Sequence, residues 1–508
     1  MLGAGGLLAA CGLNSSSPTT TKASSPKGGV FTTSIDGVKV RQAQWVIEEN
    51  KKPGSLGWII GGKPPAHGLE GYAATTSADR SGHVDLMIST TEPTFKVEAW
   101  RMGYYQGTGG RLIWTSATLP GKQQPAPTVD SSVGMVTCHW TPSVRVPLKT
   151  FPPGSYLFKM VSPSGWHQWI PFVVRDDAHP STYLIMTAVT TYQAYNMWGG
   201  YSLYHDEAGS RAKRAVAVSF NRPYAQDYEQ GAADFVTNEL PLVFDMERRG
   251  LDVSYWTDID LHLHGRDLSR YGSLMSLGHD EYWSLEMRDH AEAALATGTN
   301  IAFLGANAVY RKIRLEAQDG KLARIEVNYK DDTDPAGRKN PKDATSNWAS
   351  PPVNRPESLL TGVTYVTDSG VGPLVVVDAQ GWWWKGTGVK DGQSFFRAMQ
   401  GEYNRFIPGG QGPQNIQLFG HSPMNKGDFA DISYLTKEGG GGVFSTGIGN
   451  FIALLANPEK IPTAVLPGPN TTVTPILLRA MLNLYGLWSQ GPASKSMPSK
   501  ANWQGLVK

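Results

Sequence analysis

The sequence has little cysteine, little charge and no long apolar run. Cys11 and Cys138 are its two cysteines, and neither stands at a strand-to-helix turn, so we expect no thiol chemistry. Charged residues make up 18% of the chain, against about a quarter in ordinary proteins, and 46 basic residues nearly balance 44 acidic ones. Without a basic excess we expect no nucleic-acid partner. No apolar stretch reaches about 18 residues, which argues against a membrane-spanning helix.

What is present points to a folded protein with many turns. The 508 residues are enough for two or three domains, and a hydrophobic fraction of 40% excludes a disordered chain. The counts of 57 glycines and 34 prolines favour turns over long helices. Sixteen tryptophans require either a large core or surfaces lined with aromatic rings.

The N-terminus carries a pattern typical of exported proteins. The segment MLGAGGLLAA is apolar, rich in small residues and ends at Cys11, which resembles a bacterial lipobox. Residues 14–27 are rich in Ser, Thr and Pro and predict a flexible tether. We therefore expect lipidation of Cys11, a membrane anchor and a location in the cell envelope, or secretion. No Lys or Arg precedes Cys11, which leaves a displaced start or an accidental match open.

Residues 28–178 have the rhythm of an antiparallel β-sandwich. Val84, Leu86 and Ile88 alternate with His83, Asp85 and Met87, and Gly/Pro-rich turns separate several runs of this kind. From residue 179 the rhythm changes to apolar strands joined by helices. Such βαβ units predict a mostly parallel sheet of the flavodoxin or glutamine-amidotransferase type over residues 179–490, followed by a tail at 491–508. The polar segment from Lys321 to Glu357 is interpreted as a surface excursion.

In an open α/β sheet, ligands bind outside the carboxyl ends of the strands. Each apolar run in this domain is followed by a segment rich in Tyr, His, carboxylate and amide side chains. The segments are TYQAYNMWGG at 191–200, YWTDIDLH at 255–262, GHDEYWS at 278–284, FLGANAVYR at 303–311, GEYNR at 401–405 and VFSTGIGNF at 443–451.

This ordered set of segments resembles the large subunit of bacterial N,N-dimethylformamidase. The segments RMGYYQGTGGR at 101–111 and IPFVVRD at 170–176 are similar to the β-sandwich of that family, so the resemblance covers roughly residues 28–488. It implies a hydrolase of small linear amides with a mononuclear ferric ion held by two tyrosines and one glutamate. Carried over by motif, the implied ligands are Tyr282, Tyr310 and Glu402. Hard anionic oxygen donors of this kind suit a highly charged cation.

The resemblance also implies which side chains would handle protons. His279, Asp280 and Glu281 are placed for acid–base work, and Asn307 and His421 are expected to stabilise the developing oxyanion. The family leads us to expect a histidine two residues before the glutamate ligand, where Gln400 stands before Glu402. The family enzyme also works with a separate small subunit, so an oligomer or a second chain is expected.

Two alternatives remain open from the sequence. A zinc ion could be held by the alternating side chains of Asp258, Asp260, His262 and His264. A protein of another class, a non-catalytic envelope lipoprotein, could bind glycan or a partner protein. In such a binding protein the run Trp382–Trp384 would be a stacking surface for the ligand. The alternative is that these tryptophans form a packed edge.

Overall fold

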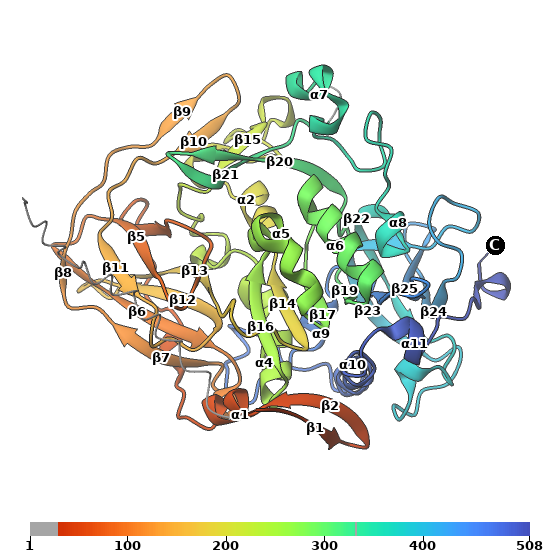
Figure 1. Cartoon of the computed structure of the whole chain (residues 1–508). Helices are drawn as coiled ribbons and strands as arrows, with labels where there is room; N and C mark the ends of the chain where they lie inside the picture. Colours follow the sequence, from red (N-terminus) through yellow and green to blue (C-terminus); the bar gives the residue numbers. More distant parts are fainter. Residues whose placement is uncertain (1–28, 331–332, 508) are drawn as a thin grey trace, which may run out of the picture.

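The computed structural model describes residues 29–330 and 333–507 (Figure 1). The predicted lipidation site Cys11 and the predicted tether at 14–27 lie outside the described residues. Within the described part of the chain, no helix is both long and apolar enough to cross a membrane. Strands in several sheets and helices are combined in a mixed α/β fold.

The N-terminal region contains two sheets that share one hydrophobic core. Side chains from both sheets, including Leu86 of β5 and Val97 of β6, are fully buried in that core. This packing is sandwich-like, and the predicted alternation at Val84, Leu86 and Ile88 is confirmed because all three are buried. The smaller sheet has the order β11-β5-β3 and the larger the path β4-β13-β12-β6-β7, with β8 paired to β6. Their bounds are β3 (Leu69–Ala73), β4 (Ser77–Asp79), β5 (His83–Thr90), β6 (Thr94–Met102), β7 (Gly110–Thr115), β8 (Leu119–Pro120), β11 (Val144–Pro147), β12 (Gly154–Val161) and β13 (His167–Arg175).

A seven-stranded sheet follows, with the order β16-β14-β17-β19-β26-β25-β24. The first five strands run parallel to one another. β25 is antiparallel to both β26 and β24, so the sheet is mixed. It stands at the centre of the molecule in Figure 1. The bounds are β14 (Tyr183–Thr187), β16 (Val253–Thr257), β17 (Ser273–Leu277), β19 (Asn300–Leu304), β24 (Gln417–Pro423), β25 (Phe429–Thr436) and β26 (Gly442–Ser445).

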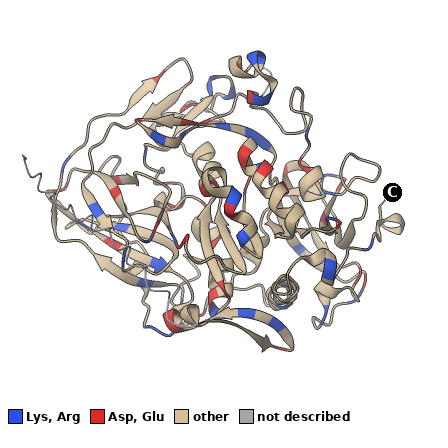
Figure 2. Cartoon of the chain, in the orientation of Figure 1, with Lys and Arg blue, Asp and Glu red and all other residues tan. Residues whose placement is uncertain are grey.

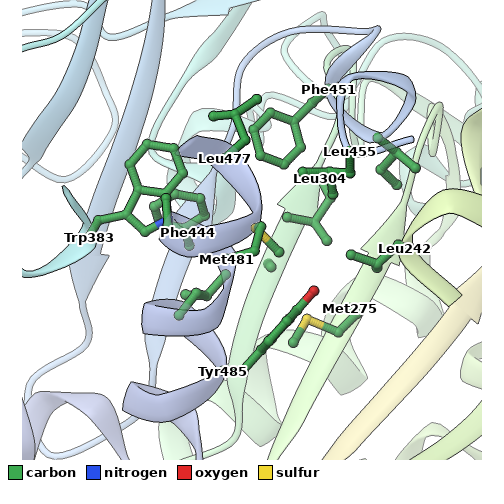
Figure 3. Packing of buried hydrophobic residues seen from close by; sticks show 14 of the residues in the cluster. Leu242, Met275, Leu304, Trp383, Phe444, Phe451, Leu455, Leu477, Met481 and Tyr485 are labelled. Carbon is green, nitrogen blue, oxygen red and sulfur yellow. The ribbon is translucent and has the colours of Figure 1, made fainter. Parts of the chain in front are cut away.

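Helices cover both faces of this sheet, which explains why its central strands are mainly apolar and are buried at every position. Tyr183 and Ile185 of β14 belong to the core that includes α4 (Leu240–Arg248) and α10 (Thr474–Trp488). Figure 3 shows this core, where Tyr485 and Met481 of α10 lie near Met275 of the sheet. The alternate residues Leu184 and Met186 pack with α5 (Asp258–His264) and α6 (Leu285–Thr297). Ser284 as an N-cap and Gly298 as a C-cap predict a helix between them, and α6 confirms it, with Ser284 as its N-cap and a left-handed Gly298 after it.

Two segments can be compared with what the sequence predicts for them. One differs from the prediction, and the other decides between two interpretations. The predicted surface excursion contains a strand, β21 (Lys321–Val327), which pairs with β20 (Arg311–Gln318) and β15 (Ala217–Ser219). Lys321, Arg324 and Glu326 give this strand the charge of a solvated loop, although Arg324 and Glu326 are buried. Trp383 and Trp384 are buried beside Phe419 and Phe444, so the tryptophan run packs in the core and offers no stacking surface.

The remaining elements connect these sheets. They are β1 (Val30–Ile35), β2 (Val38–Ala43), α1 (Gln44–Asn50), β9 (Thr128–Asp130), β10 (Met135–Thr137), α2 (Val189–Tyr195), α3 (Phe235–Asn238), β18 (Tyr282–Ser284), α7 (Pro335–Lys339), α8 (Ser358–Thr361), β22 (Thr364–Val375), β23 (Ser394–Arg405), α9 (Phe451–Leu454) and α11 (Ala493–Ser496).

A buried ion pair joins the N-terminal sheets to the α/β part. Arg101 of β6 and Glu247 of α4 form this pair, and both side chains are 0% exposed. Glu247 also accepts a hydrogen bond from Asn50 Nδ2 at 2.9 Å, and Arg101 donates to the Tyr105 hydroxyl at 2.8 Å. Figure 2 shows acidic and basic residues interspersed along the elements.

Candidate functional site

The candidate site lies where three parallel strands end, as the sequence predicts. Helix α2 follows β14, the segment 278–281 follows β17, and the segment 305–310 follows β19. The last two segments touch through their glycines, because a Cβ atom on Gly305 would lie 1.8 Å from the carbonyl oxygen of Gly278. Asn307 and Val309 adopt positive φ angles of 57° and 58°, which is strained for a β-branched residue such as Val309. Close packing thus fixes both segments against each other.

The carboxylate of Glu281 is the centre of the site. The hydroxyl of Tyr195, the last residue of α2, donates to Glu281 Oε2 at 2.9 Å. The Tyr204 hydroxyl donates to the same oxygen at 2.7 Å and to Oε1 at 3.0 Å. His279 Nε2 lies 3.3 Å from Oε2, and the rings of Tyr195 and Tyr204 stack at 4.2 Å. Two phenols, a carboxylate and an imidazole therefore converge, although they are up to 86 residues apart.

A second carboxylate completes this cluster. Glu402 of β23 places Oε2 2.9 Å from His279 Nε2, so the imidazole lies between two carboxylates. Asn307 Nδ2 donates to Glu402 Oε1 at 3.2 Å. The backbone N–H of Asn307 in turn donates to Asn404 Oδ1 at 2.8 Å. Glu402 and Asn404 lie on the same face of β23, so one strand supplies both the carboxylate and the group that holds Asn307.

Cationic and aromatic side chains surround Glu281. Arg311 Nε is 3.4 Å from Glu281 Oε1, and its guanidinium lies over the ring of Tyr310 at 4.8 Å. Lys330 Nζ lies 3.2 Å from the centre of the Tyr204 ring. Both cations favour the ionised form of Glu281.

These contacts set the charges of the site. Burial opposes ionisation of Glu281, but the hydrogen bond and charge of His279, helped by Arg311 and Lys330, lower its pKa to about 2. Burial and the nearby Glu281 charge raise the pKa of both Tyr195 and Tyr204, so both are neutral phenols that donate their protons to the carboxylate. Although burial acts against it, the negative charge of Glu402 and Glu281 raises the pKa of His279 well above its usual value.

The predicted ligands Tyr282, Tyr310 and Glu402 contact three different partners. The Tyr282 hydroxyl donates to the Tyr204 hydroxyl at 2.8 Å, and the Tyr310 hydroxyl accepts from Asn347 Nδ2 at 3.0 Å. Glu402 is bonded to His279 and Asn307. Among the described residues no hydrogen bond joins these three side chains to one another.

Two predicted catalytic side chains have partners elsewhere. Asp280 is buried and accepts from Ser276 Oγ at 2.6 Å and from Trp283 Nε1 at 2.8 Å, so it holds the segment 278–281 in place. Burial raises its pKa to about 6. His421 pairs with Asp431 at 2.6 Å and stacks on Phe429. It lines a cavity of about 370 Å³ whose lining includes none of the side chains around Glu281.

The zinc alternative does not match the contacts. Asp258 accepts from the backbone N–H of Thr190, and Asp260 accepts from Thr257. His262 is hydrogen-bonded to Ser284 Oγ at 2.8 Å. In the part of the chain that the structure describes, no three His, Cys, Asp or Glu side chains form a group that could hold a metal ion.

Sequence reasoning placed Tyr195 in a candidate segment but gave it no role, and it missed Tyr204. The position of Tyr195 after the first parallel strand is a usable signal. Tyr204 lies in a segment without regular secondary structure, nine residues further on, and Lys330 follows β21. No spacing rule connects these two residues with the strand ends.

Comparison with known proteins identifies the family. The family model described as N,N-dimethylformamidase beta subunit-like, C-terminal, matches residues 96–463, well over half of the chain. A search of curated proteins found no match. The matched range contains every side chain of the Glu281 cluster. The chain therefore belongs to the N,N-dimethylformamidase beta subunit-like family.

Proposed function

We propose that the chain is a metal-dependent hydrolase of small carboxamides whose cation is held by Tyr195, Tyr204 and Glu281. The observation that carries this proposal is the convergence of two phenol hydroxyls on one carboxylate, at 2.7 to 3.0 Å. The donor set fits a hard, highly charged cation such as ferric iron, because such a cation can replace the two phenolic protons.

The position of His279 supports this set over Tyr282, Tyr310 and Glu402. The family leads us to expect a histidine two residues before the glutamate ligand, and His279 stands in that relation to Glu281. The departure at Gln400 then concerns a residue outside the ligand set. Gln400 is exposed, and its side chain donates to the backbone carbonyl of Arg397.

A bound ferric ion would supply Lewis acidity, which polarises an amide carbonyl and lowers the pKa of water. The protein's own groups move the protons. Burial raises the pKa of Glu402, which suits its carboxylate to take a proton from the attacking water. Protonated His279 can pass a proton from Nε2 to the departing amine nitrogen, and the two flanking carboxylates stabilise its charge.

Asn307 holds the Glu402 carboxylate in position against His279. Its amide donates to Glu402 Oε1, which leaves Oε2 directed at His279. The oxyanion role predicted for Asn307 stays a prediction. The lipid on Cys11, the envelope location and a separate small subunit likewise stay predictions.

The test is amine release from a panel of formamides and acetamides by iron-loaded protein. His279→Gln should lower kcat by about 10²- to 10⁴-fold, because it removes the proton donor. Gln400→His is the matched control and should leave kcat unchanged. Absence of turnover on every carboxamide, in protein with stoichiometric metal, would contradict the proposed reaction.

A further inference from the structure

A small cavity lies between the N-terminal sheets and helix α2. Its volume is about 30 Å³, and its lining includes two arginines, Arg222 and Arg324, with Tyr72, Gln193 and Tyr224. Both arginines are almost fully buried, at 2% and 3% exposed. Buried guanidinium groups are normally neutralised by a carboxylate, since an unpaired buried charge is costly.

Arg222 has hydrogen bonds but no counter-charge. Its Nη1 donates to the carbonyls of Trp198 and Tyr201, and its Nη2 donates to those of Gln193 and Asn196. The Nε–H is buried and has no acceptor among the described residues. Arg222 therefore holds the end of α2 through neutral oxygens alone and retains one unused donor.

Arg324 is bound in the same way. It donates to the Asn221 side chain at 2.9 and 3.0 Å and to the Phe220 carbonyl at 2.8 Å. In the described ranges neither arginine has an ion pair with a carboxylate. Burial lowers the pKa of each guanidinium to about 10, which still leaves both charged at neutral pH.

Glu326 is an acidic group near Arg222, but it forms no ion pair with either arginine in the described ranges. Glu326 of β21 is fully buried, and neither of its oxygens has a hydrogen-bond donor among the described residues. Burial and the neighbouring Asp258 raise the pKa of Glu326 well above its usual value, which disfavours its charged form. Two guanidinium groups thus line one cavity without an ion pair to a carboxylate in the described ranges.

We propose that this cavity is a binding site for a chloride-sized inorganic monoanion held by Arg222 and Arg324. A water molecule needs roughly 10–15 Å³ of such space, so the cavity has room for about two waters or one halide. The proposal does not depend on the proposed amidase activity.

The direct test is crystallography of the full chain grown in sodium bromide. Anomalous scattering should show one bromide in the cavity, within hydrogen-bond distance of an arginine nitrogen of Arg222 or Arg324. An ordered water without anomalous signal at saturating bromide would overturn the proposal.

A solution test uses the melting temperature at constant ionic strength. Replacing sodium gluconate by sodium chloride should raise Tm with a saturable dependence, because gluconate is too large to enter. Arg324→Gln should raise the half-saturating chloride concentration by about tenfold or more, as expected for loss of a charged hydrogen bond. Arg145→Gln removes a surface arginine, 64% exposed, and should leave that concentration unchanged. If chloride and gluconate give the same Tm at every concentration, no such site exists. If Arg324→Gln fails to fold, the bromide experiment on the unchanged protein decides whether the cavity binds an anion.

Discussion

The buried pair of Arg101 and Glu247 is expected to contribute strongly to stability because it joins the two halves of the fold. Arg101→Met leaves Glu247 buried without a cation and also deprives the Pro153 carbonyl of its 2.9 Å hydrogen bond. Removing one partner of a fully buried pair costs about 3–5 kcal/mol. The control is Arg145→Met, whose pair with Asp85 is exposed and worth at most about 1 kcal/mol.

Urea unfolding followed by tryptophan fluorescence measures both losses. The double variant Arg101→Met with Glu247→Met should recover about 1–3 kcal/mol relative to the sum of the single losses, because the charge left behind is also removed. A loss of no more than about 1 kcal/mol for Arg101→Met, equal to that of Arg145→Met, would refute the reasoning.

Three further outcomes follow from the structure. Burial raises the pKa of Glu239 to about 8, so the native state keeps a proton that the unfolded chain releases above about pH 4.3. The free energy of unfolding should therefore fall as pH rises from about 4.5 to 8, by at most about 1.4 kcal/mol per pH unit. In urea unfolding, Glu239→Gln should show a smaller change of this free energy with pH. An equal change in both proteins would contradict this. Tyr282→Phe should keep its iron and shift the visible band, because Tyr282 only donates to the Tyr204 hydroxyl; loss of iron would restore Tyr282 as a ligand. Asn404→Ala should lower kcat by about tenfold or more with iron content unchanged, because the Asn307 backbone N–H loses its acceptor; parallel loss of iron would show a structural role instead.

Local patterns in the sequence predict most of the secondary structure that carries the site. The strands Ser273–Leu277 and Asn300–Leu304 are short, mainly apolar runs of the kind that predicts a strand covered on both faces, and every residue of both strands is buried. The helix after Ser284 is marked by its cap and by Gly298. The sequence of the strand Lys321–Val327 is interpreted as part of a surface excursion because it carries charged residues within a polar segment.

The ligand set is harder to predict because it depends on side-chain directions at segment ends. Glu281 and Tyr282 are adjacent, yet the carboxylate receives two phenols while the Tyr282 hydroxyl meets only one of them. Tyr204 reaches Glu281 from a segment without helical or strand periodicity. The order of the motifs along the chain predicts which strand ends form the site. Which side-chain oxygens meet there depends on tertiary packing.

The most direct test of the central claim is iron analysis combined with the visible spectrum of the purified protein. We predict one iron per chain with a broad phenolate-to-iron band, lost in Tyr204→Phe and in Glu281→Gln and retained in Tyr310→Phe. Retention of iron and band in Tyr204→Phe, with their loss in Tyr310→Phe, would contradict the assignment of the metal to Tyr195, Tyr204 and Glu281.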